Sequence, residues 1–267
     1  MISNKSCNLI PSLFVTHGGG PLPLLDKQND IAELLRSVPS RCLYDKPNFV
    51  LVITAHWITN GITVSSSQKH KLLFDYSGFQ KESYELEYNA PGSPILAEKI
   101  SSLLNSGGIY CSLDDKRGLD HGVFVPLMLM YPSAEIPIVS MSIDQSLDPE
   151  MHIRIGNLLS SLREENVLII GSGSSFHNFD YFFTKNRNKL AEGIRYSKLW
   201  QDFLAETLTS PEISEVERNH RLITWKNAPG GIQAHPIGQE EHLIPLHVIF
   251  FYSITIYHIQ KGDIWNC

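Results

Sequence analysis

Residues 167–177 read Val167-Leu168-Ile169-Ile170-Gly171-Ser172-Gly173-Ser174-Ser175-Phe176-His177, and this stretch decides the fold. Its first four residues are apolar and mostly β-branched, which predicts a short buried strand. The glycines and serines that follow permit a tight turn and a close approach of backbone. His177 comes directly after them. The stretch therefore predicts a strand that brings an imidazole to one edge of a sheet.

The same pattern occurs twice earlier in the chain. Residues 12–16 lead to His17 and three glycines, and residues 49–55 lead to His56. Parallel strands of an open sheet form their binding sites beyond their carboxyl ends. We therefore expect His17, His56 and His177 to converge on one crevice. A metal ion is the simplest reason to gather imidazoles there.

Strand-like and helical segments alternate through the rest of the chain. Further strands are predicted at 62–65 and 136–143, and amphipathic helices at 31–38 (ended by Pro39), 94–104 and 151–162. This alternation predicts a single α/β domain over residues 1–267, with a central, mostly parallel sheet and helices on both faces. The metal site is expected at the C-terminal ends of the strands. Residues 70–91 are rich in aromatic side chains without a clean period, which predicts an ordered loop that packs in the core or walls a pocket.

The composition restricts the class of protein further. The chain has 267 residues, 42% of them hydrophobic, which is enough for one sizeable core. Its net charge of −6, without a basic cluster, argues against nucleic acid or an anionic membrane as the main partner. Four widely spaced cysteines without a C-x-x-C argue against a thiolate zinc site or a disulfide framework.

The cellular location is predicted from the same features. The N-terminus lacks the apolar region of a signal peptide. The longest apolar run, residues 243–259, is interrupted by proline and histidine, so a membrane span is not expected. We expect a cytoplasmic protein that is a monomer or a small homo-oligomer.

The segment 228–248 adds a further candidate site residue. A proline is tolerated only near the first turn of a helix, so a helix that contains Pro245 must begin close to His242. His242 then lies at the helix mouth, where the acidic residue Glu241 suits the positive end of the dipole. His247 lies about 140° further around the helix, so His242 and His247 cannot bind one metal ion.

Seven short motifs occur in a fixed order from about residue 11 to residue 252. They are Thr16-His17-Gly18-Gly19-Gly20-Pro21, Thr54-Ala55-His56-Trp57, Tyr88-Asn89-Ala90-Pro91-Gly92-Ser93-Pro94, Leu119-Asp120-His121-Gly122 with Val125-Pro126-Leu127, Ile143-Asp144, Gly171-Ser172-Gly173 leading to His177-Asn178, and Glu241-His242-Leu243-Ile244-Pro245-Leu246. Together they resemble the DOPA-dioxygenase type of class III extradiol ring-cleaving dioxygenases. That family is related to the catalytic subunit of protocatechuate 4,5-dioxygenase.

The resemblance implies one divalent metal ion per chain, held by His17, His56 and His242. His177 would be a further ligand or the acid–base group beside the ion, and His121 would line the pocket. Similar proteins are seen with Zn²⁺, whereas ring cleavage needs Fe²⁺. The implied partners are a small aromatic substrate of the catechol type and O₂.

Two details of the site stay open at this stage. Glu241 is an alternative to His242 as third ligand, because many Fe²⁺ oxygenases bind the metal through two histidines and a carboxylate. Asp120 or Asp144 could orient a ligand histidine through its second ring nitrogen. We hypothesise that His177 moves the catechol proton, since imidazole titrates near neutrality.

The predicted function is that of a metal-dependent oxidoreductase, an extradiol dioxygenase that opens a DOPA-like catechol with O₂. One alternative is a zinc-dependent hydrolase on the same scaffold, in which metal-bound water attacks an amide or ester. Another is a non-catalytic binding protein that retains the crevice. The C-terminus departs from the family, because residues 253–267 lack the usual final strand with its aromatic–Arg–aromatic pattern. Either residues 254–259 replace that strand, or an edge of the sheet is missing.

Overall fold

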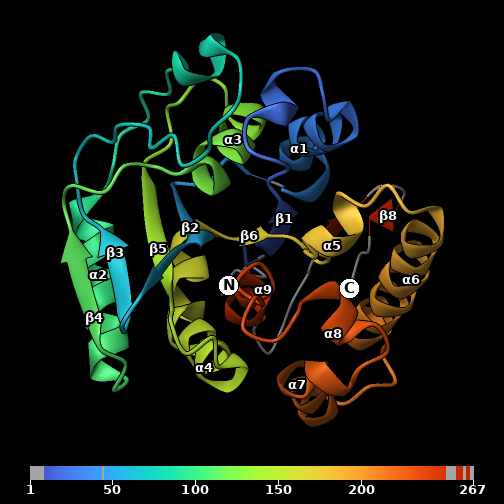
Figure 1. Ribbon diagram of the computed structural model, residues 1–267. Coiled ribbons are helices and arrows are strands. Elements are labelled where there is room, and N and C mark those ends of the chain that lie inside the picture. The colour runs from blue at the N-terminus through green and yellow to red at the C-terminus, as the bar shows by residue number, and fades with distance from the viewer. Residues whose placement is uncertain (1–8, 44, 251–256, 261–262, 265–267) are drawn as a thin grey trace.

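A single sheet forms the centre of the molecule in the computed structural model, which describes residues 9–43, 45–250, 257–260 and 263–264. Its eight strands lie in the order β4-β3-β5-β2-β6-β1-β7-β8 (Figure 1). They are β1 (Ser12–Thr16), β2 (Phe49–Thr59), β3 (Ile62–Ser65), β4 (Cys111–Asp114), β5 (Ile138–Asp144), β6 (Val167–Gly173), β7 (Tyr257–Gln260) and β8 (Asp263–Ile264).

The strands are mostly parallel, as predicted. β5, β2, β6, β1 and β7 all run in one direction, whereas β3 pairs with β5 and β8 with β7 in the antiparallel sense. The carboxyl ends of β1, β2 and β6 therefore open on the same edge of the sheet. Each of these strands precedes one of the three histidines singled out by the sequence, or contains it.

Helices cover both faces of the sheet, as expected for this α/β class. They are α1 (Asn29–Cys42), α2 (Pro94–Ser106), α3 (His121–Met130), α4 (Pro149–Leu159), α5 (Phe179–Phe182), α6 (Arg187–Thr209), α7 (Glu215–Ile223), α8 (Gly231–Ala234) and α9 (Ile244–Ile249). Figure 1 shows α1 and α3 on one face, and α4 and α9 on the other.

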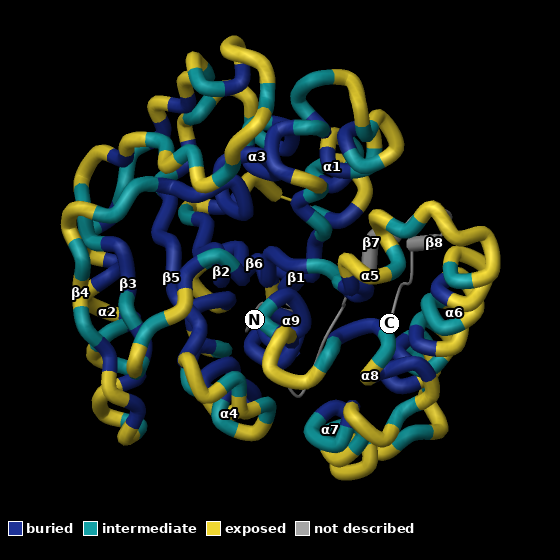
Figure 2. Tube along the Cα trace, in the orientation of Figure 1, coloured by how far each residue is buried: buried dark blue, intermediate teal, exposed yellow. Residues whose placement is uncertain are grey.

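Alternate side chains of β2 pack into two different hydrophobic clusters, one on each face of the sheet. Val50 and Val52 belong to the cluster that includes α1 and α3, whereas Leu51 and Ile53 belong to the cluster that includes α4 and α9. All four are fully buried, and Figure 2 shows the central strands buried along most of their length. Burial on both faces explains the continuous apolar run, because a strand covered on one side only would alternate apolar and polar residues.

Two local expectations were wrong. α1 does not end at Pro39 but continues to Cys42. Proline removes one helix hydrogen bond, and the burial of Val38 and Cys42 against the core holds this last turn in place. The strand expected at 49–55 continues to Thr59, so His56 lies inside β2 and not beyond its end.

The strands β7 and β8 form the side of the sheet that lies beyond β1. Residues 257–259 pair in parallel with residues 13–15 of β1. A strand in this region was one of the two alternatives for the divergent C-terminus, although residues 254–256 lie outside the described part. Of the apolar run 243–259, only the six residues of α9 are helical in the described chain. Within the described ranges, no helix is long and apolar enough to cross a bilayer.

Candidate metal centre

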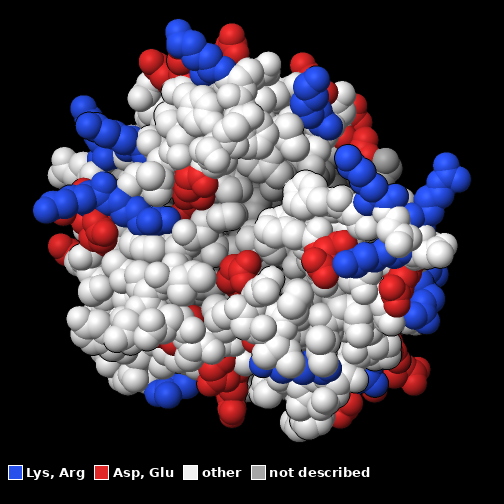
Figure 3. All heavy atoms as spheres, in the orientation of Figure 1, with Lys and Arg blue, Asp and Glu red and all other residues white. Residues whose placement is uncertain are grey.

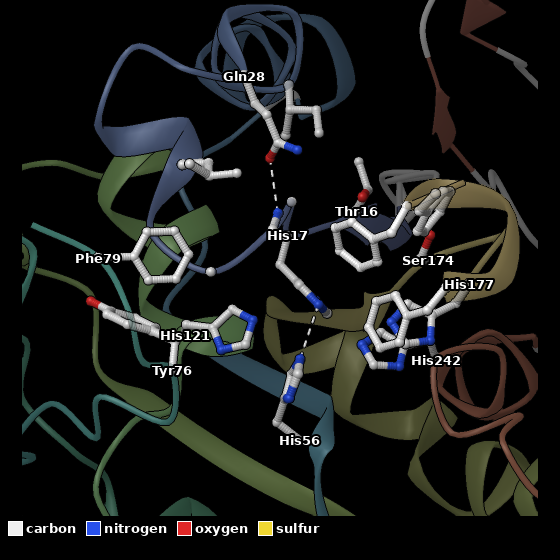
Figure 4. Close-up of a pocket in the computed structure, with 18 residues that line it drawn as sticks. Thr16, His17, Gln28, His56, Tyr76, Phe79, His121, Ser174, His177 and His242 are labelled. Carbon is white, nitrogen blue, oxygen red and sulfur yellow. Dashed lines mark hydrogen bonds between the residues drawn. The ribbon is translucent and has the colours of Figure 1, made fainter. Parts of the chain in front are cut away.

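Three imidazoles meet at the carboxyl edge of the sheet. His17 follows β1, His56 lies in β2, and His242 lies two residues before α9. One ring nitrogen from each lies within 4.8 Å of the others, and Figure 4 shows the rings turned toward a common space. His17 and His242 are almost fully buried, with 3% and 5% of their surface exposed. The strand ends predicted the convergence of His17, His56 and His177. The structure shows it for His17 and His56, and the third facing nitrogen belongs to His242, which the family resemblance implied.

Irregular backbone places two of these rings. The register between β2 and β5 shifts between Ile53 and Ile58, and His56 lies in this interval. Such a bulge re-aims the side chains of a strand. The end of β6 holds His242, because the backbone N–H of Ser174 donates to the His242 carbonyl over 3.0 Å. A Cβ on Gly173 would lie 2.1 Å from that carbonyl oxygen, so only glycine permits this contact.

A serine determines which nitrogen of His17 faces the site. The hydroxyl of Ser172 donates its single proton to the carbonyl of Gly122 over 2.5 Å. Toward the Nδ1 of His17, 2.9 Å away, the same oxygen can therefore only accept a hydrogen bond. The proton of a neutral His17 must lie on Nδ1, which leaves a lone pair on Nε2.

Two carboxylates act on the other rings in the same way. The Nδ1 of His242 donates to the Oε1 of Glu241 over 2.9 Å. The Oδ2 of Asp75 lies 3.5 Å from the Nδ1 of His56, and its Oδ1 accepts a hydrogen bond from the Nδ1 of His121 over 2.8 Å. These contacts favour the proton on Nδ1 and leave the Nε2 lone pairs directed into the site.

The protonation of these groups follows from their burial and neighbours. Burial, together with the neighbouring His56 and His242, lowers the pKa of His17 well below its usual value. Burial, together with His121 and His242, lowers the pKa of His56 to about 3. Burial alone would raise the pKa of Glu241, but the hydrogen bond and charge of His242 outweigh it and lower this pKa to about 2. His17 and His56 are therefore neutral at pH 7, and Glu241 is ionised beside His242.

The facing nitrogens fit a metal ion. The Nε2 atoms of His17 and His56 lie 3.1 Å apart, and with both protons on Nδ1 two lone pairs point at each other. A cation between them removes this repulsion. Neighbouring ligand nitrogens about 2.0–2.1 Å from a tetrahedral ion would lie about 3.3 Å apart, which is close to the distance found. The donor set is therefore suited to a divalent transition metal.

His177 and His121 flank this group. The ring of His177 stacks on that of His242, with centroids 3.5 Å apart, and its Nδ1 lies 3.6 Å from Glu241. No nitrogen of His177 belongs to the group formed by His17, His56 and His242. His177 does form a second possible metal-binding group with Glu241 and His242. The ring of His121 lies 4.0 Å from that of His56, centroid to centroid.

All five of these histidines line one cavity of about 450 Å³. The aromatic loop predicted at 70–91 supplies Tyr76 and Phe79 to its wall. The ring of Tyr76 also contacts Phe124 of the core. The loop therefore both packs in the core and walls the pocket, the two roles between which the sequence left a choice.

The prediction that Asp120 or Asp144 orients a ligand histidine was wrong. Asp120 accepts hydrogen bonds from Thr54 and Arg117, and Asp144 accepts them from the backbone of Gly61 and Ser146. Among the described contacts, neither carboxylate is bonded to a candidate ligand. Asp75 has the role predicted for them, and no periodic pattern marks it, because it lies between Phe74 and Tyr76 in an irregular loop.

Replacing Ser172 with alanine tests the tautomer argument. The Ser172→Ala variant leaves the Nδ1 of His17 without its acceptor, so we expect metal affinity to fall about 10–100-fold. Competition with a fluorescent chelator measures this change. Ser140→Ala is the matched control, because Ser140 is a buried strand serine whose hydroxyl has no hydrogen-bond partner among the described residues. Equal affinities in the two variants would contradict the argument.

His235 and His247 are buried outside the metal group. The Nε2 of His235 bonds to the Ser175 carbonyl and that of His247 to the Leu222 carbonyl. Burial lowers their pKa values to about 3 and about 4, respectively. Their hydrogen bonds identify them as structural residues.

These buried histidines make stability depend on pH. Below the ordinary histidine pKa of 6.5, the unfolded chain binds protons that the folded chain excludes. The free energy of unfolding therefore has its full value above pH 6.5 and falls as the pH drops toward 4. For His247 alone the slope approaches about 1.4 kcal/mol per pH unit. Urea denaturation of the chelated protein at pH 7 and pH 5 measures it. His247→Asn, which keeps a donor for Leu222, should reduce this loss, and an unchanged loss would contradict the assignment.

The fold agrees with comparisons to known proteins. Residues 11–250 match the family described as catalytic LigB subunit of aromatic ring-opening dioxygenase. Dioxygenase tasH of Hapsidospora irregularis is 38% identical over 255 residues, which cover 89% of this chain and 76% of that protein. The 4,5-DOPA dioxygenase extradiol of Beta vulgaris is 36% identical over 243 residues, with coverages of 90% and 86%. The crystal structure of an uncharacterized protein from Escherichia coli K12 superposes with a TM-score of 0.61 at 28% identity, covering 82% of this chain and 80% of that one.

The molecule is an enzyme of the dioxygenase kind, built on an α/β fold with a histidine-rich crevice. The chain belongs to the LigB family of aromatic ring-opening dioxygenases, which depend on a metal ion. The predicted family is thereby confirmed.

Proposed function

We propose that this protein opens the ring of a catechol-type aromatic with O₂ by extradiol cleavage. One divalent ion per chain is held by His17, His56 and His242, and it is Fe²⁺ in the form that cleaves the ring. The observation that carries this proposal is the group of three ring nitrogens, one each from His17, His56 and His242, that lie within 4.8 Å of one another in the wall of an aromatic cavity. When bound, Fe²⁺ supplies open positions for the substrate and O₂ and the electron transfer that their reaction needs.

His242 is a better third ligand than Glu241. The Oε1 of Glu241 already accepts from the Nδ1 of His242 and lies 3.6 Å from the Nδ1 of His177. A carboxylate that orients two imidazoles has a supporting role typical of residues behind a metal site. The Nε2 of His242, by contrast, is free to bind the ion.

His177 is the proton acceptor in this scheme. Burial and the adjacent His242 lower its pKa to about 4, so the ring is neutral at pH 7 and can take a proton from a catechol hydroxyl. Glu241 stabilises the imidazolium that forms, and His177 returns the proton after the ring has opened. Stacking on His242 holds the acceptor beside the ion.

His121 binds and orients the substrate. Its Nδ1 donates to Asp75 and its Nε2 faces the cavity, where a ring without a proton on Nε2 can act as an acceptor. This nitrogen can accept a hydrogen bond from the second catechol hydroxyl. The rings of Tyr76 and Phe79 cover the same side of the cavity and exclude water from the reacting atoms.

Metal reconstitution tests the proposal. The protein is stripped with a chelator, loaded anaerobically with Fe²⁺ or Zn²⁺, and mixed with catechol in an oxygen electrode. We expect the iron form alone to consume one O₂ per catechol and to give a yellow ring-opened product. An inert mixture at full iron loading would contradict the proposal. Turnover of an ester by the zinc form without O₂ would instead select the hydrolase.

A further inference from the structure

The charged groups around the cavity restrict which substituents the substrate can carry. Among the described residues that line it, none is lysine, arginine, aspartate or glutamate. Several polar groups in its wall are already bonded to the protein: Gln28 accepts from the Gly19 backbone, Ser174 donates to the Phe176 carbonyl, and Tyr76 donates to the Ser83 carbonyl. A charged substituent held inside the cavity would therefore have no lysine, arginine, aspartate or glutamate partner in the described lining.

Two carboxylates and one guanidinium lie close behind the cavity wall. Arg117 donates to the backbone carbonyl of His56 over 3.1 Å and also pairs with Asp120. Asp75 and Glu241 lie behind the histidines that line the cavity, at 2.8 Å from His121 and 2.9 Å from His242. On the face drawn in Figure 3, lysine and arginine lie mostly toward the edges. The two carboxylates oppose a substrate carboxylate placed near His121 or His242, while a bound metal ion would neutralise part of their field.

One wall of the cavity is unusually apolar and exposed. Phe179, Phe182 and Phe183 line it although 56%, 52% and 77% of their surfaces are accessible. α5 begins just after His177, and the ring of Phe179 lies 4.7 Å from that of His177, centroid to centroid. Leu22 and Ile31 also line the cavity. Exposed aromatic rings grouped at one pocket mark a surface that a ligand covers.

We propose that the substrate is a catechol whose substituent is uncharged and apolar, seated against Phe179, Phe182 and Phe183. These three residues determine specificity by covering the substituent, and the cavity rejects catechols that carry a carboxylate. The inference thereby departs from the DOPA-like substrate expected from the sequence. The inference rests on the proposed ring-cleaving function and narrows its substrate class.

Matched substrates test the specificity. Catechol, 4-butylcatechol and 3-(3,4-dihydroxyphenyl)propanoate are compared with the iron-loaded protein by kcat/KM; the last two have substituents of similar length but different charge. We expect 4-butylcatechol to exceed the propanoate by about tenfold or more. Phe183→Ala should reduce the preference for 4-butylcatechol over catechol, and Phe183→Arg should raise relative turnover of the propanoate. Ile95→Ala is the control, because Ile95 is an exposed apolar residue of α2 and 82% accessible.

A binding measurement separates recognition from chemistry. Calorimetric titration of the zinc-loaded protein with the same catechols should give the same ranking of dissociation constants. Equal or tighter binding and faster cleavage of the propanoate, with catechol itself cleaved, would overturn this inference and leave the proposed function standing. Failure of every catechol at full iron loading would instead remove the proposed function.

Discussion

Replacing His56 with alanine will leave the protein folded but unable to retain its metal ion. His56 contributes one of the three facing nitrogens, and the remaining pair is too few to hold a divalent ion against a chelator. We expect metal content to fall from one ion per chain to below about a tenth, and ring cleavage to become undetectable. Elemental analysis after gel filtration and an oxygen electrode measure the two effects.

The metal-free forms provide a further check. In the wild-type chain the Nε2 atoms of His17 and His56 face each other across 3.1 Å. His56→Ala removes this repulsion, so the metal-free variant should unfold at a temperature no lower than that of the metal-free wild type. His220→Ala is the matched control, because His220 is exposed on α7. A His56→Ala protein that keeps one ion per chain would show that other residues bind the metal.

Replacing His177 with alanine will separate catalysis from metal binding. If His177 accepts the catechol proton, its loss should lower kcat about 10²–10⁴-fold while the ion stays bound. The acid limb of the pH–rate profile, where a neutral base is lost as the pH falls, should disappear in the variant. Added imidazole should restore part of the rate, because it can occupy the vacated space beside His242.

The alternative role of His177 gives a different result. Loss of the ion together with the rate would make His177 a ligand, in line with its place in a second group with Glu241 and His242. His220→Ala is again the control, because His220 is exposed on α7. An unchanged kcat in His177→Ala would remove the proposed role.

The strands and most of the site could be predicted because local chemistry marks them. Runs such as residues 167–170 are continuous and apolar, since helices cover both faces of the sheet, and glycines follow where backbone approaches closely. Pro245 located the start of α9, and hence the position of His242. These signals involve residues that are close together along the chain, so they can be recognised from the sequence alone.

The supporting residues could not be predicted because they depend on long-range geometry. Asp75 reaches His121 and His56 only through the fold of an irregular loop. Ser172 lies in the stretch 167–177 that predicted the fold. Its role in orienting His17, however, depends on the Gly122 carbonyl, which α3 brings beside β6. The bulge at His56 likewise arises from pairing with β5, which the sequence of β2 does not reveal.

The distance along the chain between the three candidate ligands has a mechanical consequence. His17 directly follows the first strand, and His242 lies just before the last described helix. A shared ion would therefore act as a crosslink that closes nearly the whole polypeptide into loops. Such a link lowers the entropy of the unfolded chain and adds its binding energy to folding. Depletion of the ion would therefore loosen both ends of the molecule together, and proteases would cut the depleted protein sooner than the loaded one.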